Sequence, residues 1–157
     1  MFIENSSFNM DKGNVYQTIR KEIDSRIFKL QQALKSQKES LSSASESTAG
    51  DKHNTSRAMM HMEEEKLGQQ MIQLEQLKRL IQKINPENTL LTIGLGSLVK
   101  TNRGWLYIAV PLGKIMIQEQ ELMAISLASP IGQALKEKKV GESTKIQGIE
   151  WEIHQIS

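Results

Sequence analysis

Asp51 is the carboxylate most favourably placed for chemistry, because it directly follows Gly50 in a polar break between two long helical patterns. An aspartate after a turn glycine most often caps the next helix, but an acid at the far end of a rod is also suited to delivery into a channel of another protein. His53 stands two residues further on, where a solvated turn histidine is the simpler interpretation. The sequence thus leaves Asp51 open both as a helix cap and as an acid that the rod presents to a partner protein.

Other patterns typical of catalysis are missing from the sequence. The chain has no cysteine, which excludes disulfides, thiolate zinc sites and cysteine nucleophiles. The three histidines, at 53, 61 and 154, have no metal-ligand spacing, and Gly94-Leu95-Gly96-Ser97 lacks the third glycine of a dinucleotide-binding loop. We therefore expect no active site of the chain's own, hence no enzyme, and no intrinsic cofactor.

Length and charge narrow the class of protein further. A chain of 157 residues fits one domain or two small ones. With 20 basic and 18 acidic residues, its formal charge of +2 is too balanced to attract nucleic acid through bulk charge. No apolar run approaches the roughly 18 residues of a membrane span, and no basic leader precedes an apolar stretch. We expect a cytoplasmic protein without a membrane partner.

Heptad spacing in the first half predicts two long helices. One apolar seam runs over about residues 11–43, and a second runs over about 54–84 until Asn85-Pro86 ends it. The first seam contains Tyr16, Ile23, Ile27, Leu30 and Leu34, and the second contains Met60, Leu67, Leu74, Leu77 and Ile81. We predict an antiparallel coiled-coil hairpin over 11–85, with its tip at 42–54 and an irregular segment at 1–10.

The hairpin has one rival interpretation and one weak region. A parallel homodimer would also bury such seams, but the break at 42–51 separates two series of matched length, so we favour a monomer. We place Glu63 and Gln70 at seam positions, which indicates looser packing toward the tip.

Short β-type segments alternate with turn residues in the second half. Candidate strands cover 97–101, 105–110, 114–117, 122–126, 144–147 and 149–156. Pro130 opens a short helix that ends near 136–139, with Gly141 beyond it. Residues 90–157 therefore predict a small antiparallel sheet with one short helix, and the whole chain belongs to the α+β class.

One run of residues in this half resembles a known family. Ser129-Pro130-Ile131-Gly132, followed by Lys138-Lys139-Val140-Gly141, is similar to the C-terminal motif of the GreA/GreB transcript-cleavage factors. Gly96-Ser97-x-Val99 looks like the strand that opens the same domain in that family, and Ala49-Gly50-Asp51 looks like its coiled-coil tip.

The resemblance implies a fold, a partner and a set of residues. It implies a coiled-coil hairpin followed by an FKBP-like domain that binds bacterial RNA polymerase at the rim of the secondary channel through Ser129, Pro130, Ile131 and Gly132. The hairpin would enter the channel toward the RNA 3′ end. Its tip acids, here Asp51, would help to hold a Mg²⁺ shared with the polymerase, so that backtracked RNA is hydrolysed.

The chain departs from the family at the tip, where Asn54 stands in place of a glutamate. A neutral amide oxygen binds Mg²⁺ more weakly than a carboxylate and cannot act as a base. Glu46, on the other side of the turn, is a further acid within the tip. Stimulated cleavage and simple occlusion of the channel therefore both stay open, as do a coiled-coil interaction scaffold and, least favoured, a prolyl isomerase.

Overall fold

The computed structural model describes residues 9–45 and 52–157, with the side chains of 44–45 and 52–55 outside that description. The elements in order are α1 (Lys12–Ser45), α2 (Lys52–Gln82), β1 (Leu98–Thr101), β2 (Gly104–Ile108), β3 (Gly113–Ile117), β4 (Gln120–Ile125), α3 (Pro130–Leu135), β5 (Ser143–Ile146) and β6 (Ile149–Ile156). The chain forms two compact units. The hairpin unit is Lys21–Arg79, and the sheet unit combines Leu80–Ser157 with the start of α1 up to Arg20.

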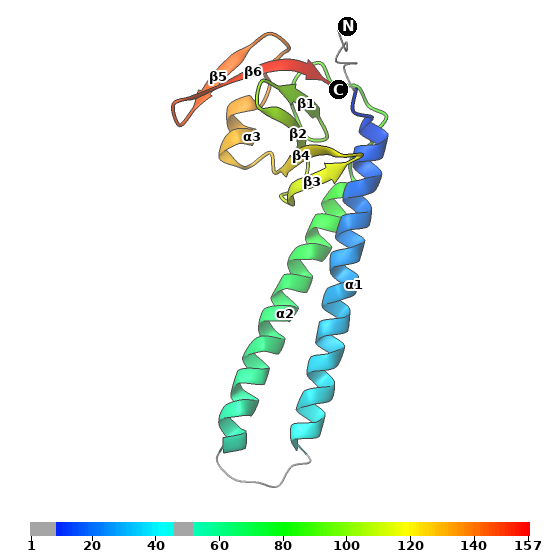
Figure 1. Ribbon diagram of the computed structural model, residues 1–157, viewed down its shortest axis with the longest axis vertical. Helices are drawn as coiled ribbons and strands as arrows, with labels where there is room; N and C mark the ends of the chain where they lie inside the picture. Colours follow the sequence, from blue (N-terminus) through cyan, green and yellow to red (C-terminus); the bar gives the residue numbers. More distant parts are fainter. Residues whose placement is uncertain (1–8, 46–51) are drawn as a thin grey trace, which may run out of the picture. The chain divides into compact units, whose positions relative to one another are not determined.

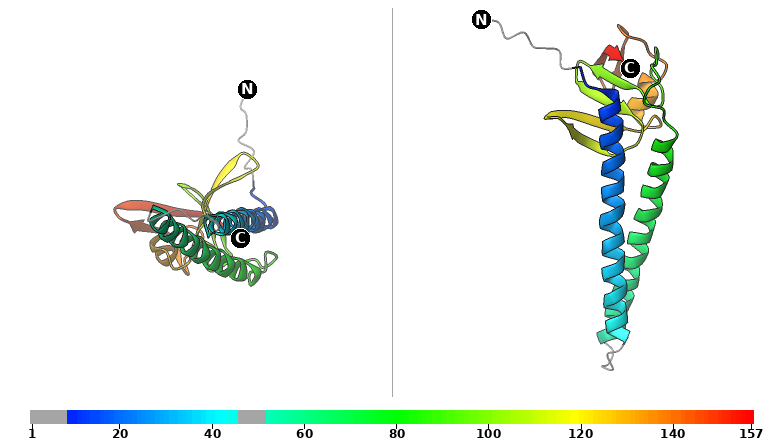
Figure 2. Two further views of the ribbon diagram at one scale, coloured as in Figure 1. Left: turned by 90° about the horizontal axis from the view of Figure 1, so that it is seen from below. Right: turned by 90° about the vertical axis from the view of Figure 1, so that its right-hand side faces the viewer.

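Within the hairpin unit, α1 and α2 run antiparallel along each other (Figure 1). Lys78 Nζ lies 2.8 Å from Asp24 Oδ1, and Gln37 Nε2 donates to the Met60 carbonyl at 3.1 Å. Residues near the start of α1 therefore lie beside residues near the end of α2, and residues near the end of α1 lie beside the start of α2. Figure 2 shows the same antiparallel arrangement. The predicted antiparallel hairpin is confirmed.

The seam of the hairpin is buried at Ile23 and Leu30 and only partly shielded from solvent beyond them. Leu34, Leu67 and Leu74 are half-buried, as expected for two helices that cover each other along a single stripe. The placement of Glu63 and Gln70 in the seam is wrong, because both are exposed. Their neighbours Glu64 and Met71 are half-buried instead, since a heptad seam alternates steps of four and three residues from Met60.

Six strands in the order β3-β4-β2-β1-β6-β5 make up the sheet of the second unit. With the hairpin and the short α3, this sheet confirms the α+β class. One pairing differs from the all-antiparallel prediction, because β2 and β4 run parallel, with Trp105 opposite Leu122. The chain leaves β2 for the outer strand β3 and returns through β4, so β4 reaches β2 in the same direction. Local alternation of side chains predicts strands but not their neighbours.

Alternation along β2 gives the sheet two buried faces. Leu106 and Ile108 point to one face, where they join a core that also contains Ile93, Val99, Ile125, Ile153 and Leu135 of α3. Trp105 and Tyr107 point to the other face and are also buried. The α3 helix therefore contributes to one core, and the second face needs a different cover.

The first turns of α1 and the end of α2, both within the sheet unit, supply apolar side chains for the second face. Val15, Ile19 and Ile81 are at most 1% exposed. Burial, and to a lesser extent the charge of Tyr16 on α1, raises the pKa of Tyr107 above its usual range. At the end of α2, a Cβ added to Gly96 would lie 2.9 Å from Ile84 Cγ2, so the backbone approaches this side chain closely.

Candidate functional site

The predicted metal site at the tip lies outside the described residues. This applies to Asp51 and Glu46, while Asn54 belongs to the backbone of α2 without a described side chain. Within residues 9–45 and 52–157, no group of three or more His, Asp or Glu side chains is arranged to hold a metal ion. The assignment of Asp51 as a Mg²⁺ ligand in complex with the polymerase therefore stays a prediction.

Ser129 builds the turn that opens α3. Its Oγ accepts from the Gly132 amide at 3.0 Å and donates to the Ser126 carbonyl at 2.7 Å. This is an N-cap, in which a side-chain oxygen satisfies an amide that has no partner within the helix. Pro130 takes the first helical position, where its fixed φ suits the helix and its missing N–H costs nothing.

Gly132 is required by close packing. A Cβ at this position would overlap the carbonyl oxygen of Ser126 and lie 2.7 Å from that of Leu127. Both atoms belong to the backbone that enters the turn, so relief would require the chain itself to move. Two of the four residues that the resemblance implies for docking, Ser129 and Gly132, thus have a structural task in this turn.

The other two residues of the motif face a cavity. Pro130 is exposed, and Ile131 is half-buried with one side packed against the core. They line an open cavity of about 330 Å³ between α3 and the β5–β6 hairpin, which we call the apolar groove. Its principal lining residues are Ile125, Pro130, Ile131, Ile146, Ile149 and Trp151.

Four of these lining residues, Ile125 at the end of β4 and three on the β5–β6 hairpin, were missed by sequence reasoning. Ile146 and Ile149 flank the Gln147-Gly148 turn between β5 and β6, and Trp151 follows on β6. Ile149 is 42% exposed, unusual for a large apolar side chain beside a hairpin turn. The sequence did contain a signal for an exposed apolar surface here: isoleucines on both sides of a turn, with a tryptophan two residues further on.

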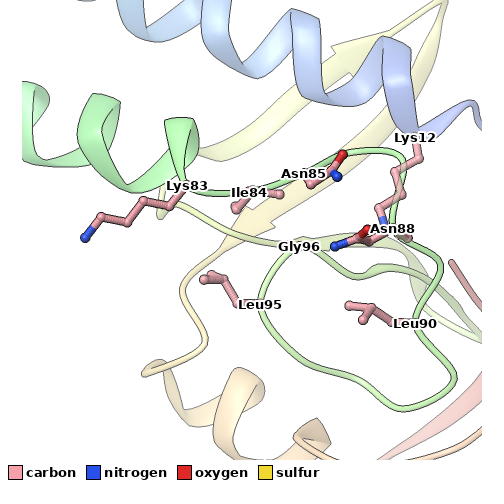
Figure 3. Close-up of a pocket in the computed structure, with 8 residues that line it drawn as sticks. All are labelled: Lys12, Lys83, Ile84, Asn85, Asn88, Leu90, Leu95 and Gly96. Carbon is pink, nitrogen blue, oxygen red and sulfur yellow. The ribbon is translucent and has the colours of Figure 1, made fainter.

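A smaller cavity of about 120 Å³ lies where the segment after α2 passes the start of α1 (Figure 3). Lys12 Nζ donates to the Asn88 carbonyl at 2.6 Å, and burial lowers the pKa of this lysine. Lys83 also lines the cavity, but Figure 3 shows its side chain pointing away from Lys12 and Asn88. The two amines do not converge on one point, so the contact of Lys12 ties the segment after α2 to α1.

Comparisons with known proteins give a distant structural likeness. No protein-family model and no curated protein matches the chain. Among solved structures, the chain is similar to the transcription factor Gfh1, with 21% sequence identity, a TM-score of 0.37, and coverage of 87% of this chain and 92% of that one. A likeness this distant carries no argument about function. No helix in the described part of the chain is long and apolar enough to span a membrane.

Proposed function

We propose that the chain is a Gre-like regulator of transcription elongation that binds bacterial RNA polymerase at the secondary channel. In this proposal the sheet unit docks on the polymerase, and the tip of the hairpin is directed toward the active site. The observation that carries the proposal is the apolar groove beside the Ser129–Gly132 turn, because it supplies an exposed binding surface at the motif on which the resemblance rests.

The groove has the properties of a docking surface for an apolar protein segment. Its volume of about 330 Å³ accommodates one or two large apolar side chains. The Ser129 cap and the tightly packed Gly132 fix one wall before any partner arrives. A wall that is already ordered loses little conformational entropy on binding, so more of the contact energy appears as affinity.

The dimensions of the hairpin suit insertion into a channel. The 34 residues of α1 rise by about 1.5 Å each, which gives a helix about 50 Å long. In the proposal such a rod delivers Asp51 to the Mg²⁺ of the polymerase. Asn54 adds at most a neutral oxygen there, so we expect weak stimulation of RNA cleavage and occupancy of the channel as the main effect.

Binding to core RNA polymerase tests the proposal most directly. The variant Pro130→Ala/Ile131→Asp removes the exposed part of the motif, but Ile131 also packs on the core, so its fold must be checked by circular dichroism. Ile149→Asp is a cleaner variant, because Ile149 is 42% exposed and lines the groove. Met116→Asp is the matched control, since Met116 is 56% exposed on β3 and lies outside the groove.

We expect wild type and Met116→Asp to co-purify with the polymerase and Ile149→Asp to be lost. Equal retention of wild type, Met116→Asp and Ile149→Asp would contradict docking through the groove. Absence of binding by wild type would contradict the proposed function and favour a coiled-coil scaffold instead.

Release of 3′ RNA fragments from backtracked complexes tests the tip. We expect Asn54→Glu to raise the release rate at fixed Mg²⁺ and Asp51→Asn to remove the remaining stimulation. Strong cleavage that is insensitive to Asp51→Asn would show that another residue serves the metal.

A further inference from the structure

The turn between β1 and β2 reaches across to the strand that carries Trp151. Arg103 lies in this turn, and its Cζ is 5.8 Å from the centroid of the Trp151 ring. Its Nε donates to the carbonyl of Glu150, the residue before Trp151, at 3.1 Å. One side chain therefore contacts both the ring and the backbone next to it.

Asn102, next to Arg103, holds the backbone on both sides of Trp151. Its Nδ2 donates to the Glu150 carbonyl at 3.2 Å, and its Oδ1 accepts from the Glu152 amide at 2.8 Å. Regular pairing between β1 and β6 reaches only Thr101 opposite Ile153, after a register shift beyond Lys100. The Asn102 amide adds one more backbone hydrogen bond, to the Glu152 carbonyl at 3.2 Å, and the side chains of Asn102 and Arg103 continue the attachment of β6 beyond it.

We propose that Arg103 is a positioning residue that holds the Trp151 ring as a wall of the apolar groove. This inference rests on the proposed function, because the groove is the docking surface named there. Asn102 fixes the backbone around Trp151, and Arg103 adds a cation against the ring, the interaction that orders the indole itself.

The turn end of the β5–β6 hairpin extends beyond the pairing of β6 with β1, which reaches only Ile153. In the described residues, β5 pairs only with β6, forms one edge of the sheet and contacts α3. The part of a hairpin that extends beyond the rest of a sheet depends on side-chain contacts to hold its position. Ile146 and Ile149 stand at its turn, so tilting of this hairpin would change the width of the groove. Arg103 limits that motion at Trp151 and presents the groove in its open form.

The second tryptophan provides a matched control within the same molecule. Lys100 Nζ lies 5.7 Å from the centroid of the Trp105 ring, and Trp105 is outside the groove. With 5-fluorotryptophan in the full chain, ¹⁹F NMR reports each ring separately, and Trp105→Phe and Trp151→Phe assign the two signals. Arg103→Ala, Arg103→Lys and Lys100→Ala are then compared with wild type, and each variant is also titrated against core RNA polymerase.

We expect Arg103→Ala to shift and broaden the Trp151 signal, to leave Trp105 unchanged, and to weaken polymerase binding about two- to tenfold. Arg103→Lys, which retains a cation but lacks Nε, should recover part of both effects. Lys100→Ala should move only the Trp105 signal and leave binding unchanged.

Two results would overturn the inference. An unchanged Trp151 signal in Arg103→Ala would show that the ring is ordered without Arg103. A shifted signal with unchanged polymerase affinity would show that Arg103 orders the ring but does not position a docking wall. If wild type fails to bind the polymerase, the proposed function fails, while the ¹⁹F signals still decide whether Arg103 orders Trp151.

Discussion

The hairpin unit and the sheet unit bury their apolar residues to different depths. In the sheet unit, Leu122, Leu135 and Ile108 are fully buried, whereas in the hairpin unit burial falls along the seam, from Ile23 and Leu30, which are buried, to Leu34, Leu67 and Leu74, which are half-buried. Two helices cover each other along one stripe, while a sheet with cover on both faces encloses whole side chains. The comparison indicates a tightly packed sheet unit and a hairpin whose packing loosens beyond Leu30.

Truncation of one leucine in each unit should give the largest difference in the free energy of unfolding. Leu135→Ala removes a fully buried side chain of α3 and leaves a cavity in the core, so we expect a loss of about 2–5 kcal/mol in the free energy of unfolding. Leu74→Ala truncates a side chain that is already partly exposed to water, so the loss in the free energy of unfolding should be less than half of that for Leu135→Ala. Urea denaturation followed by circular dichroism measures both. Equal losses would contradict the contrast in burial.

Glycine-to-alanine changes should have opposite signs in the two units. Gly132→Ala forces a methyl group against the carbonyls of Ser126 and Leu127, so we expect a loss of about 1–3 kcal/mol. Gly68 lies inside α2 with nothing within 4 Å of an added Cβ, so Gly68→Ala should stabilise the chain by about 0.5–1 kcal/mol. Thermal unfolding checks both variants, and a stable Gly132→Ala would show that the turn can open without cost.

Sequence reasoning performed differently in the two units for a physical reason. Heptads and the polar break are local signals, so the hairpin followed directly, and only the seam positions of Glu63 and Gln70 were wrong, each by one residue. The positions of the strands also follow from local sequence signals. The parallel pairing of β2 with β4 does not, because it depends on where β3 is inserted in the sheet.

The groove was the least predictable feature, because three distant segments form it. The motif around Pro130 was visible in the sequence, but its neighbours Ile146, Ile149 and Trp151 join it only in the folded sheet. Ser129 and Gly132 also show that a family motif combines positions that build a turn with positions that face outward.

Alkaline pH should affect the sheet unit through Tyr107. Burial raises the pKa of this phenol in the folded state above the value of about 10 in the unfolded chain. Its contribution to stability is therefore complete below pH 10 and is lost as the pH rises above 10, because the unfolded chain releases the proton first. Lys12 opposes this trend weakly. Burial lowers its pKa in the folded state, so its contribution to the free energy of unfolding increases as the pH rises toward the pKa of the unfolded chain.

Tyr107→Phe separates this effect from packing. The Tyr107 hydroxyl has no hydrogen-bond partner among the described residues, so its removal should change stability at pH 7 by less than about 1 kcal/mol. The variant should also flatten the loss of stability between pH 10 and 11, measured by urea denaturation at each pH. An unchanged alkaline slope would show that another group titrates there.

The smallest effect should come from the ion pair that joins the two helices of the hairpin. Lys78 and Asp24 approach to 2.8 Å, but their side chains are 42% and 53% exposed, so water screens the attraction. A double-mutant cycle with Lys78→Met and Asp24→Asn should give a coupling of about 0.2–1 kcal/mol that shrinks as salt is raised. A coupling well above this range, or one insensitive to 1 M salt, would mean that this part of the hairpin excludes water as the sheet core does. The contrast between a tightly packed sheet unit and a more loosely packed hairpin would then be wrong at this level of α1 and α2.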